Sequence, residues 1–386
     1  MIEHIRVLSE EIGRRPSGTD AADEAVDYAR GLLEGWGYAV EVQEFTATAG
    51  PGVFLQTTVD VTSPEPREIP AFLFDGSGSG DIAAPLIDAG TGLPEEFPAD
   101  ANGAVVLLQR EDVPFADMAQ RALDAGASAM VVANKEGGGF RGVLDPPSVL
   151  PSVAIPKADG DALRELLAAG AVEVSVHVPS DVLVRNVIAR PQNGVCVTVS
   201  GGHLDSVPWS PGATDNASGS AAVLELARAA AASGMPGHCF ALFGGEEIGL
   251  FGSERFVAAF DDTERERFQA YFNYDVVTSK GVPLYLGSTA LADEAGALAD
   301  ELAIEAQRGQ LPEDVGSDHL SFLDAALPAL MLTTPDFVLI HTPRDTLDNM
   351  DTTYLQDILD LGFALLRAHG LPPTATPQAV LPRALP

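Results

Sequence analysis

Residues 194–245 read GVCVTVSGGHLDSVPWSPGATDNASGSAAVLELARAAAASGMPGHCFALFGG. The stretch begins with an apolar run, 194–202, that predicts a buried strand, and residues 218–233 follow with the apolar spacing of a helix. A second apolar run, 238–245, predicts another strand directly after that helix. A strand, a crossover helix and a strand in succession are typical of two parallel strands in one sheet.

The same alternation continues to residue 370. Further strands are predicted at 182–190, 270–275 and 327–333, and further helices at 253–260, 291–306 and 352–370. Strands that alternate with helices in this way favour a mostly parallel sheet with helices on both faces. We therefore expect an α/β fold with a mostly parallel sheet sandwiched by helices.

Possible metal ligands follow the predicted strands. Ligands bind at the carboxyl ends of strands in open α/β sheets, and the side chains expected there are His203, Asp205, Asp215, Glu246, Glu247, Asp275 and His341. His341 is placed there by a strand predicted after Pro335. Taken singly, Asp215 could cap a helix and the two glutamates could lie in a solvated loop. Together, imidazoles and carboxylates are the ligand set of zinc and similar metals, so the pattern predicts a metal site.

The adjacent glutamates predict a division of roles. Neighbouring residues that leave a strand point in different directions, so one can coordinate a metal while the other acts as general base. Asp215, Glu247 and Asp275 supply three negative charges against four positive charges on two divalent ions, and a bridging hydroxide would neutralise the remainder. One carboxylate shared by both ions would hold them about 3.5–4 Å apart, the geometry of two-metal hydrolases.

The remaining segments predict an insert and a tail. Residues 2–12 and 20–35 are expected to be helices, the second starting after Thr19, and 38–45 and 54–61 to form a strand pair. Residues 70–180 combine short strands with two helices and are expected to fold as a separate small α/β module. The predicted catalytic domain is then 1–69 with 181–370, followed by a proline-rich tail, 371–386, that is expected to be extended or disordered.

The composition excludes several partners. The 386 residues include 56 acidic and 22 basic side chains, a net charge of −34 that repels nucleic acid and anionic membrane lipid. No apolar stretch approaches the roughly 18 residues of a membrane span. The opening residues lack a secretory signal pattern, so cytoplasmic residence is expected unless a leader was removed. Cys196 and Cys239 lie in apolar runs and are expected to be buried thiols.

Six motifs then occur in a fixed order: H-L-D-S, G-A-T-D-N-A-S-G, G-G-E-E-I-G-L-F-G-S, N-Y-D, G-S-D-H-L-S-F and I-H-T-P-R-D-T-L. In these motifs the chain resembles the co-catalytic di-zinc exopeptidase family that includes bacterial leucyl aminopeptidases and glutamate carboxypeptidase. Residues 70–180 resemble the protease-associated insert of that family. The resemblance implies the zinc-exopeptidase fold and two Zn²⁺ ions per chain.

The resemblance also implies a role for each candidate residue. His203 and Asp275 would hold one zinc ion, Glu247 and His341 the other, and Asp215 would bridge both. Glu246 would be the general base, and Asp205 would orient the His203 imidazole. The bond from Asp215 to the next residue is often cis in this family. The one departure is Ile340, where many members have Tyr, so the zinc ions would carry more of the oxyanion stabilisation.

The leading interpretation is a zinc-dependent aminopeptidase that acts on peptides with a free N-terminus. Asn216 favours it, because the aminopeptidases typically have Asn after the bridging aspartate and the glutamate carboxypeptidase branch has Pro. The alternatives are a carboxypeptidase or other amidohydrolase on the same core, or a receptor-like binding module without catalysis. Receptor-like members lose metal ligands, whereas every expected ligand is present here.

Several features stay open at this point. The insert is expected to cover the mouth of the site rather than to supply ligands, and the alternative is a docking surface for another protein. Trp209 could line the substrate pocket or could simply pack against its neighbours. The oligomeric state, the physiological metal and the preferred N-terminal residue are not predicted.

Overall fold

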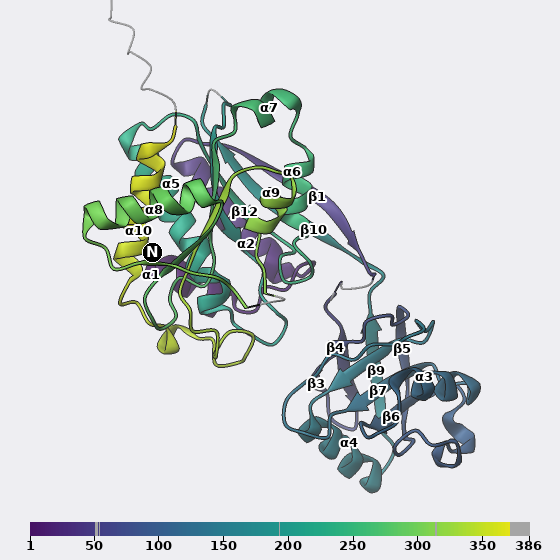
Figure 1. Ribbon diagram of the computed structural model, residues 1–386. Helices are drawn as coiled ribbons and strands as arrows, with labels where there is room; N and C mark the ends of the chain where they lie inside the picture. Colours follow the sequence, from purple (N-terminus) through teal and green to yellow (C-terminus); the bar gives the residue numbers. More distant parts are fainter. Residues whose placement is uncertain (51–52, 54, 193, 313–314, 371–386) are drawn as a thin grey trace, which may run out of the picture.

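The computed structural model describes residues 1–50, 53, 55–192, 194–312 and 315–370. These residues form two bodies, each built on an eight-stranded sheet (Figure 1). The chain leaves the larger body after β1 (Ala39–Thr48) and returns to it at β10 (Asp181–Arg190). Because Thr48 pairs with Asp181 in an antiparallel ladder, both connections to the smaller body leave from the same end of one strand pair.

The larger sheet has the strand order β1-β10-β12-β11-β13-β16-β14-β15. Its four central strands are parallel and buried along their whole length: β12 (His238–Phe243), β11 (Thr198–His203), β13 (Ala270–Tyr274) and β16 (Ala329–Thr333). The strands β10 and β14 (Leu284–Gly287) join them antiparallel, and β15 (Gln307–Arg308) is parallel to β14. The expected parallel sheet is confirmed at the centre, and its edges are mixed.

Helices cover both faces of the larger sheet. One apolar core contains side chains of α1 (Ile2–Arg6), α2 (Asp20–Gly35), α5 (Gly219–Ser233), α8 (Thr289–Leu302) and α10 (Leu355–Ala368). The opposite core contains side chains of α6 (Phe251–Ala258) and α9 (His319–Asp324), with the short α7 (Asp262–Arg267) next to it in the chain. In β12, Phe240 and Leu242 belong to the first core, and Cys239 and Phe243 to the second. This alternation is the period of two of a strand buried on both faces.

The predicted N-terminal helices are confirmed. The helix α2 spans Asp20–Gly35, and the hydroxyl of Thr19 accepts a hydrogen bond from the N–H of Ala22 at 3.3 Å. Such a side-chain cap satisfies one of the backbone donors that a helix start leaves unpaired. The first predicted helix is present as α1 continued by a π-helical turn, Val7–Ile12.

The smaller body is an α/β insert. Its sheet has the order β3-β2-β9-β5-β6-β7-β8-β4, with strands β2 (Thr58–Ser63), β3 (Arg67–Pro70), β4 (Phe72–Leu73), β5 (Gly80–Asp88), β6 (Val105–Gln109), β7 (Ala129–Ala133), β8 (Ser152–Ile155) and β9 (Glu173–Val178). Its helices are α3 (Phe115–Asp124) and α4 (Lys157–Ala169). The sheet takes in β2 and β3, so it begins before the expected boundary at residue 70.

The predicted pairing of 38–45 with 54–61 is wrong. The first segment lies in β1 and pairs with β10, whereas β2 pairs with β3 and β9 inside the insert. Both segments have the alternating pattern of a strand, but that pattern does not define the partner of an antiparallel strand.

Cys196 and Cys239 form a disulfide, so the expectation of two buried thiols is wrong. The two cysteines are separated by 43 residues in the sequence, yet their Cα atoms lie 5.4 Å apart because β11 and β12 are neighbours. This distance is within the range of disulfides in proteins.

Among the described residues, none of the helices combines the length and the apolar composition of a membrane-spanning helix. The predicted tail, 371–386, lies outside the described residues.

Candidate metal centre

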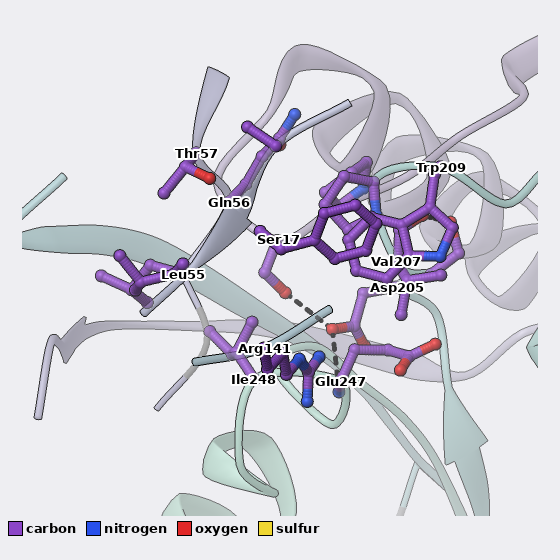
Figure 2. Close-up of a pocket in the computed structure, with 16 residues that line it drawn as sticks. Ser17, Leu55, Gln56, Thr57, Arg141, Asp205, Val207, Trp209, Glu247 and Ile248 are labelled. Carbon is purple, nitrogen blue, oxygen red and sulfur yellow. Dashed lines mark hydrogen bonds between the residues drawn. The ribbon is translucent and has the colours of Figure 1, made fainter. Parts of the chain in front are cut away.

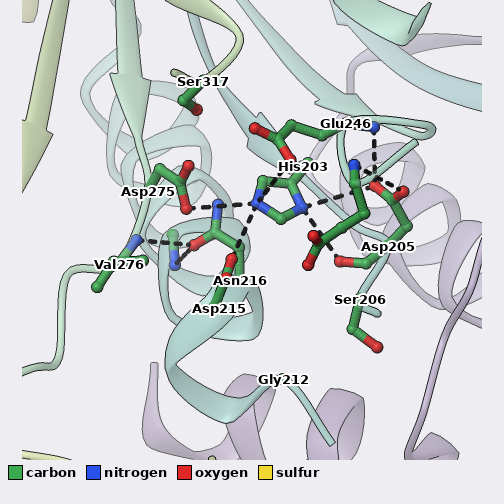
Figure 3. A network of polar contacts seen from close by, with 12 residues as sticks. His203, Asp205, Ser206, Gly212, Asp215, Asn216, Glu246, Asp275, Val276 and Ser317 are labelled. Atoms are coloured by element: carbon green, nitrogen blue, oxygen red, sulfur yellow. Dashed lines mark hydrogen bonds and ion pairs between the residues drawn. The ribbon is translucent and has the colours of Figure 1, made fainter. Parts of the chain in front are cut away.

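The predicted ligands meet at the carboxyl ends of three adjacent parallel strands. His203 is the last residue of β11, Glu246 and Glu247 follow β12, and Asp275 follows β13. Asp215 lies at a kink with non-helical backbone angles, in the segment Ala213–Ser218 that leads into α5. Because neighbouring parallel strands end at the same edge, one cluster collects side chains that are distant in sequence (Figure 3).

His341 reaches the cluster in a different way from the expected one. The strand predicted after Pro335 is absent, since residues 334–346 form a loop between β16 and the turn Leu347–Asn349. The prediction is wrong because DFVLI is apolar enough for a strand but has no partner at the sheet. His341 therefore enters the site from a loop, with a half-exposed side chain.

The two carboxylate oxygens of Asp215 face two different histidines. Oδ1 lies 3.2 Å from Nε2 of His203, and Oδ2 lies 3.0 Å from Nε2 of His341. On the first side, Oδ1 of Asp275 is 3.3 Å from the same His203 nitrogen. On the second side, Oε2 of Glu247 is 3.0 Å from the same His341 nitrogen. Asp215 thus joins two sets of donors, and its bond to Asn216 is cis.

These donors fit divalent metal ions of the zinc type. Within the described ranges, donor atoms of His203, Asp215 and Glu247 lie within 4.8 Å of one another, as do those of His203, Glu246 and Asp275. Imidazole nitrogen and carboxylate oxygen are common zinc ligands. The Oε1 atom of Glu247 is buried and has no hydrogen-bond partner among the described residues. A buried carboxylate oxygen without a donor is costly, and a cation would satisfy it.

The pKa values of the two histidines also show that the cluster favours positive charge. Burial alone would lower the pKa of His341, but Glu247 and Asp215 raise it to about 11. Burial also opposes the charge on His203, yet Glu246 and Asp275 raise its pKa well above the usual value. With a pKa of about 11, the His341 imidazole is protonated at neutral pH in the metal-free chain, where it takes the place of a cation.

The surroundings shift the pKa values of two carboxyl groups, Asp215 and Glu246, in opposite directions. Burial would raise the pKa of Asp215, but hydrogen bonds from His203 and His341 hold it low. Burial and the neighbouring carboxylates of Asp275 and Glu247 raise the pKa of Glu246 well above its usual value, against the opposing charge of His203. A carboxylate with a raised pKa is a stronger proton acceptor, which suits a general base at neutral pH.

Asp205 contacts three parts of the site. Its backbone carbonyl accepts a hydrogen bond from Nδ1 of His203 at 3.1 Å, and its Oδ1 lies 3.5 Å from the same nitrogen. Its carboxylate also accepts from the backbone N–H groups of Glu246 and Glu247 at 3.3 and 3.4 Å, and from the Ser17 hydroxyl at 2.9 Å. Asp205 is therefore placed to orient both the His203 ring and the glutamate pair.

Two further residues support the site, and sequence reasoning gave them no role. The Asp345 carboxylate accepts from the backbone N–H groups of Thr214 and Asp215. The guanidinium of Arg15 is fully buried and donates to the carbonyls of Leu8, Gly13, Leu204, Pro211 and Gly212. Asp345 lies in the motif I-H-T-P-R-D-T-L quoted above, but a motif does not reveal backbone contacts.

A cleft between the two bodies borders the site (Figure 2). Its walls include Asp205, Trp209 and Glu247 from the larger body, and Phe72 and Arg141 from the insert. Trp209 therefore lines the cleft and also packs against Phe72, with ring centroids 4.2 Å apart. The packing that the sequence suggested for this tryptophan is confirmed, and the cleft that it lines borders the proposed ligands.

Comparisons with known proteins agree with this geometry. The profile described as peptidase family M28 matches residues 186–366, and a PA-domain profile matches residues 79–163. Aminopeptidase YwaD of Bacillus subtilis is 28% identical over an alignment of 396 positions. The alignment covers 92% of this chain and 81% of that protein. An aminopeptidase of Pseudomonas aeruginosa is 30% identical, over 84% of this chain and 67% of its own length.

A solved structure extends the likeness to the whole fold. The structure of BSAP, a zinc aminopeptidase from Bacillus subtilis, matches with a TM-score of 0.71 and 27% identity, over 97% of this chain and 95% of that one. The M28 match contains every predicted ligand, and the PA match lies inside the insert. This chain therefore belongs to peptidase family M28, with a PA domain inserted into its catalytic domain.

Proposed function

We propose that this chain is a zinc-dependent aminopeptidase that removes the N-terminal residue of peptides. The proposal rests on the position of the Asp215 carboxylate. Its two oxygens lie 3.2 and 3.0 Å from the Nε2 atoms of two different histidines. One zinc ion would be held by His203 and Asp275, a second by His341 and Glu247, and Asp215 would contact both. The related proteins described above are aminopeptidases, and one is a zinc enzyme.

The chemistry divides between the ions and the protein. When bound, two such ions supply Lewis-acid activation of the scissile carbonyl and lower the pKa of a water molecule. Glu246 would remove the proton from that water and pass it to the leaving amine. Its backbone is fixed by Asp205, and its Oε2 lies 3.9 Å from Nε2 of His203, next to the proposed ligands. Asp205 would hold the His203 imidazole in its metal-binding orientation.

The proposed substrate is a peptide with a free N-terminus. Asp205 and Glu247 line the cleft beside the cluster, and an environment of buried carboxylates favours the ammonium group of such a peptide. A carboxypeptidase would instead have to bind a carboxylate at the reacting end of its substrate. Arg141 is the one cation among the described residues that line this cleft, and it comes from the insert rather than from the cluster.

We propose that the insert restricts access to the cleft. Its Phe72 and Arg141 form part of the cleft wall, so the space for the substrate beyond the scissile bond depends on the insert. Replacing residues 58–178 by a short linker, in a variant shown to be folded, should increase the activity on long peptides relative to dipeptide-like anilides. An unchanged preference would argue for the alternative, a docking surface for another protein.

The disulfide bears on the location of the protein. Disulfides persist mainly in oxidising compartments, so the Cys196–Cys239 bond favours such a compartment over the cytoplasm that the sequence suggested. Titrating the unfolded, unreduced protein for free thiols should detect none. Two free thiols per chain would favour the cytoplasm.

A comparison of substrates tests the proposed activity. Protein supplied with zinc is expected to hydrolyse amino-acid anilides and peptides with a free N-terminus. The same peptides with a blocked N-terminus, and blocked peptides that end in glutamate, should resist hydrolysis. Cleavage of the blocked, glutamate-terminated peptides alone would favour a carboxypeptidase.

A further inference from the structure

His341 differs from the other proposed ligands in how it is supported. Its side chain is 48% exposed, whereas those of His203, Asp215, Glu247 and Asp275 are at most 8% exposed. Each of those four lies at or just after the end of a sheet strand, or just before α5, whereas His341 lies in the loop 334–346. Its φ of +54° is in the left-handed region that non-glycine residues rarely adopt. Such a residue keeps its conformation only when the surrounding structure fixes it.

Trp209 supplies a fixing contact. Its indole N–H donates a hydrogen bond of 2.8 Å to the backbone carbonyl of His341. Trp209 lies in the loop that follows β11, 132 residues earlier in the chain. This bond therefore ties the backbone of one proposed ligand to the loop that leaves another, His203.

The insert holds the ring of Trp209 from the other side. Phe72 of β4 packs against it at 4.2 Å between centroids and an interplanar angle of 41°. Phe72 is itself fixed, because it pairs with Ala154 of β8 and its ring lies against the backbone of Gly139. A Cβ at Gly139 would come within 2.0 Å of the Phe72 ring, so this close approach requires glycine.

We infer that Phe72 and Trp209 are positioning residues through which the insert fixes His341 for metal binding. The chain of contacts runs from the insert sheet to Phe72, from that ring to Trp209, and from its N–H to the His341 backbone. The inference rests on the proposed function, since it takes His341 as a zinc ligand. The insert would then stabilise one of the two zinc positions, in addition to any effect on the access of substrate to the cleft.

The contact predicts unequal effects on the two zinc ions. Zinc held by His341 and Glu247 should bind more weakly when either aromatic contact is lost. Zinc held by His203 and Asp275 should bind as before, because these ligands are supported by the sheet. A residue needed only for general folding would weaken both positions.

The test is calorimetric titration of zinc into chelator-treated full-length protein. His341→Ala identifies the binding step that belongs to this position. Trp209→Phe keeps a ring against Phe72 but removes the donor, and Phe72→Ala removes the ring but keeps the donor. Each should raise the Kd of that step roughly tenfold, the lower range for residues that support metal ligands, and leave the other step unchanged. Phe72 and Trp209 act through one chain of contacts. The fold-increase in Kd for the double variant should therefore be smaller than the product of the two single fold-increases.

A matched control and a second signal complete the experiment. Phe97→Ala makes the same truncation elsewhere in the insert and should alter neither step. The protein has two tryptophans, so in a Trp36→Phe background the emission of Trp209 alone should change as the His341 position fills. Trp209→Phe keeps the packing, so its titration tests the positioning role even if Phe72→Ala does not fold.

Each outcome separates the inference from the function on which it rests. If the unaltered chain binds two zinc ions and Trp209→Phe leaves both steps unchanged, or weakens both equally, the positioning role is overturned while the proposed function stands. If the unaltered chain binds no zinc, both are overturned.

Discussion

Asp345 accepts a hydrogen bond of 3.0 Å from the backbone N–H of Asp215, the residue that faces both histidines. Its other oxygen accepts from the N–H of Thr214 at 2.7 Å, and the carboxylate is almost fully buried. Asp345 therefore joins the turn that holds Asp215 to the loop that holds His341. The two sides of the proposed metal centre are connected by a carboxylate that is not itself a proposed ligand.

Asp345→Asn should weaken zinc binding while leaving the fold intact. The amide has one acceptor oxygen, so one of the two buried N–H groups loses its partner, at a cost of about 1–3 kcal/mol. Equilibrium dialysis should show reduced zinc content at limiting metal. Asp348→Asn, an exposed change in the same region, is the control. Equal zinc content in both variants would contradict this role.

Glu246→Gln should abolish most of the turnover and retain the metal. The amide keeps the shape of the side chain but cannot accept a proton, and general-base catalysis contributes typically 10²–10⁴-fold. Glu247→Gln should instead reduce zinc content, because Glu247 is a proposed ligand. Steady-state kinetics and metal analysis on the same preparations separate the two effects. A Glu246→Gln enzyme with near-normal kcat would show that Glu246 is not the base.

Arg15→Met should destabilise the whole catalytic domain. The buried guanidinium donates to five backbone carbonyls, which would lose their partners together. We expect the free energy of unfolding to fall by about 3 kcal/mol or more, the usual scale for removing one partner of a buried charged network. Arg14 is exposed, so Arg14→Met should stay within about 0.5 kcal/mol of the unaltered protein. Similar unfolding curves in urea for both variants would contradict the structural role of Arg15.

Zinc binding should release a proton from the His341 imidazole. In the metal-free chain Glu247 and Asp215 overcome the effect of burial and raise the pKa of His341 to about 11, so the ring is protonated at pH 7. A coordinating nitrogen must lose its proton, so zinc affinity should increase as the pH rises toward that pKa. Calorimetry at pH 7 in buffers of different ionisation enthalpy measures the release. A heat of binding independent of the buffer would mean that the His341 imidazole is already neutral.

The sequence predicts those parts of the molecule that depend on local pattern. The helix at 20–35 is confirmed at both ends because Thr19 and the apolar spacing are local signals. Apolar runs predict the strands β11, β12 and β13. Because sites form at the carboxyl ends of parallel strands, His203, Glu247 and Asp275 are predicted to lie at one edge of the sheet.

The remaining features depend on contacts between distant segments. The partner of 54–61, the Cys196–Cys239 bond and the loop conformation of His341 depend on which elements become neighbours. Arg15 was missed for the same reason, since an arginine that donates to backbone carbonyls leaves no pattern of partner side chains in the sequence.

Asp215 is proposed to join two metal positions. A crystal of zinc-loaded protein, measured on both sides of the zinc absorption edge, tests it most directly. We expect two anomalous peaks about 3.5–4 Å apart, one beside His203 and Asp275 and the other beside His341 and Glu247, with an oxygen of Asp215 at each. A single peak, or two peaks that Asp215 does not connect, would contradict it.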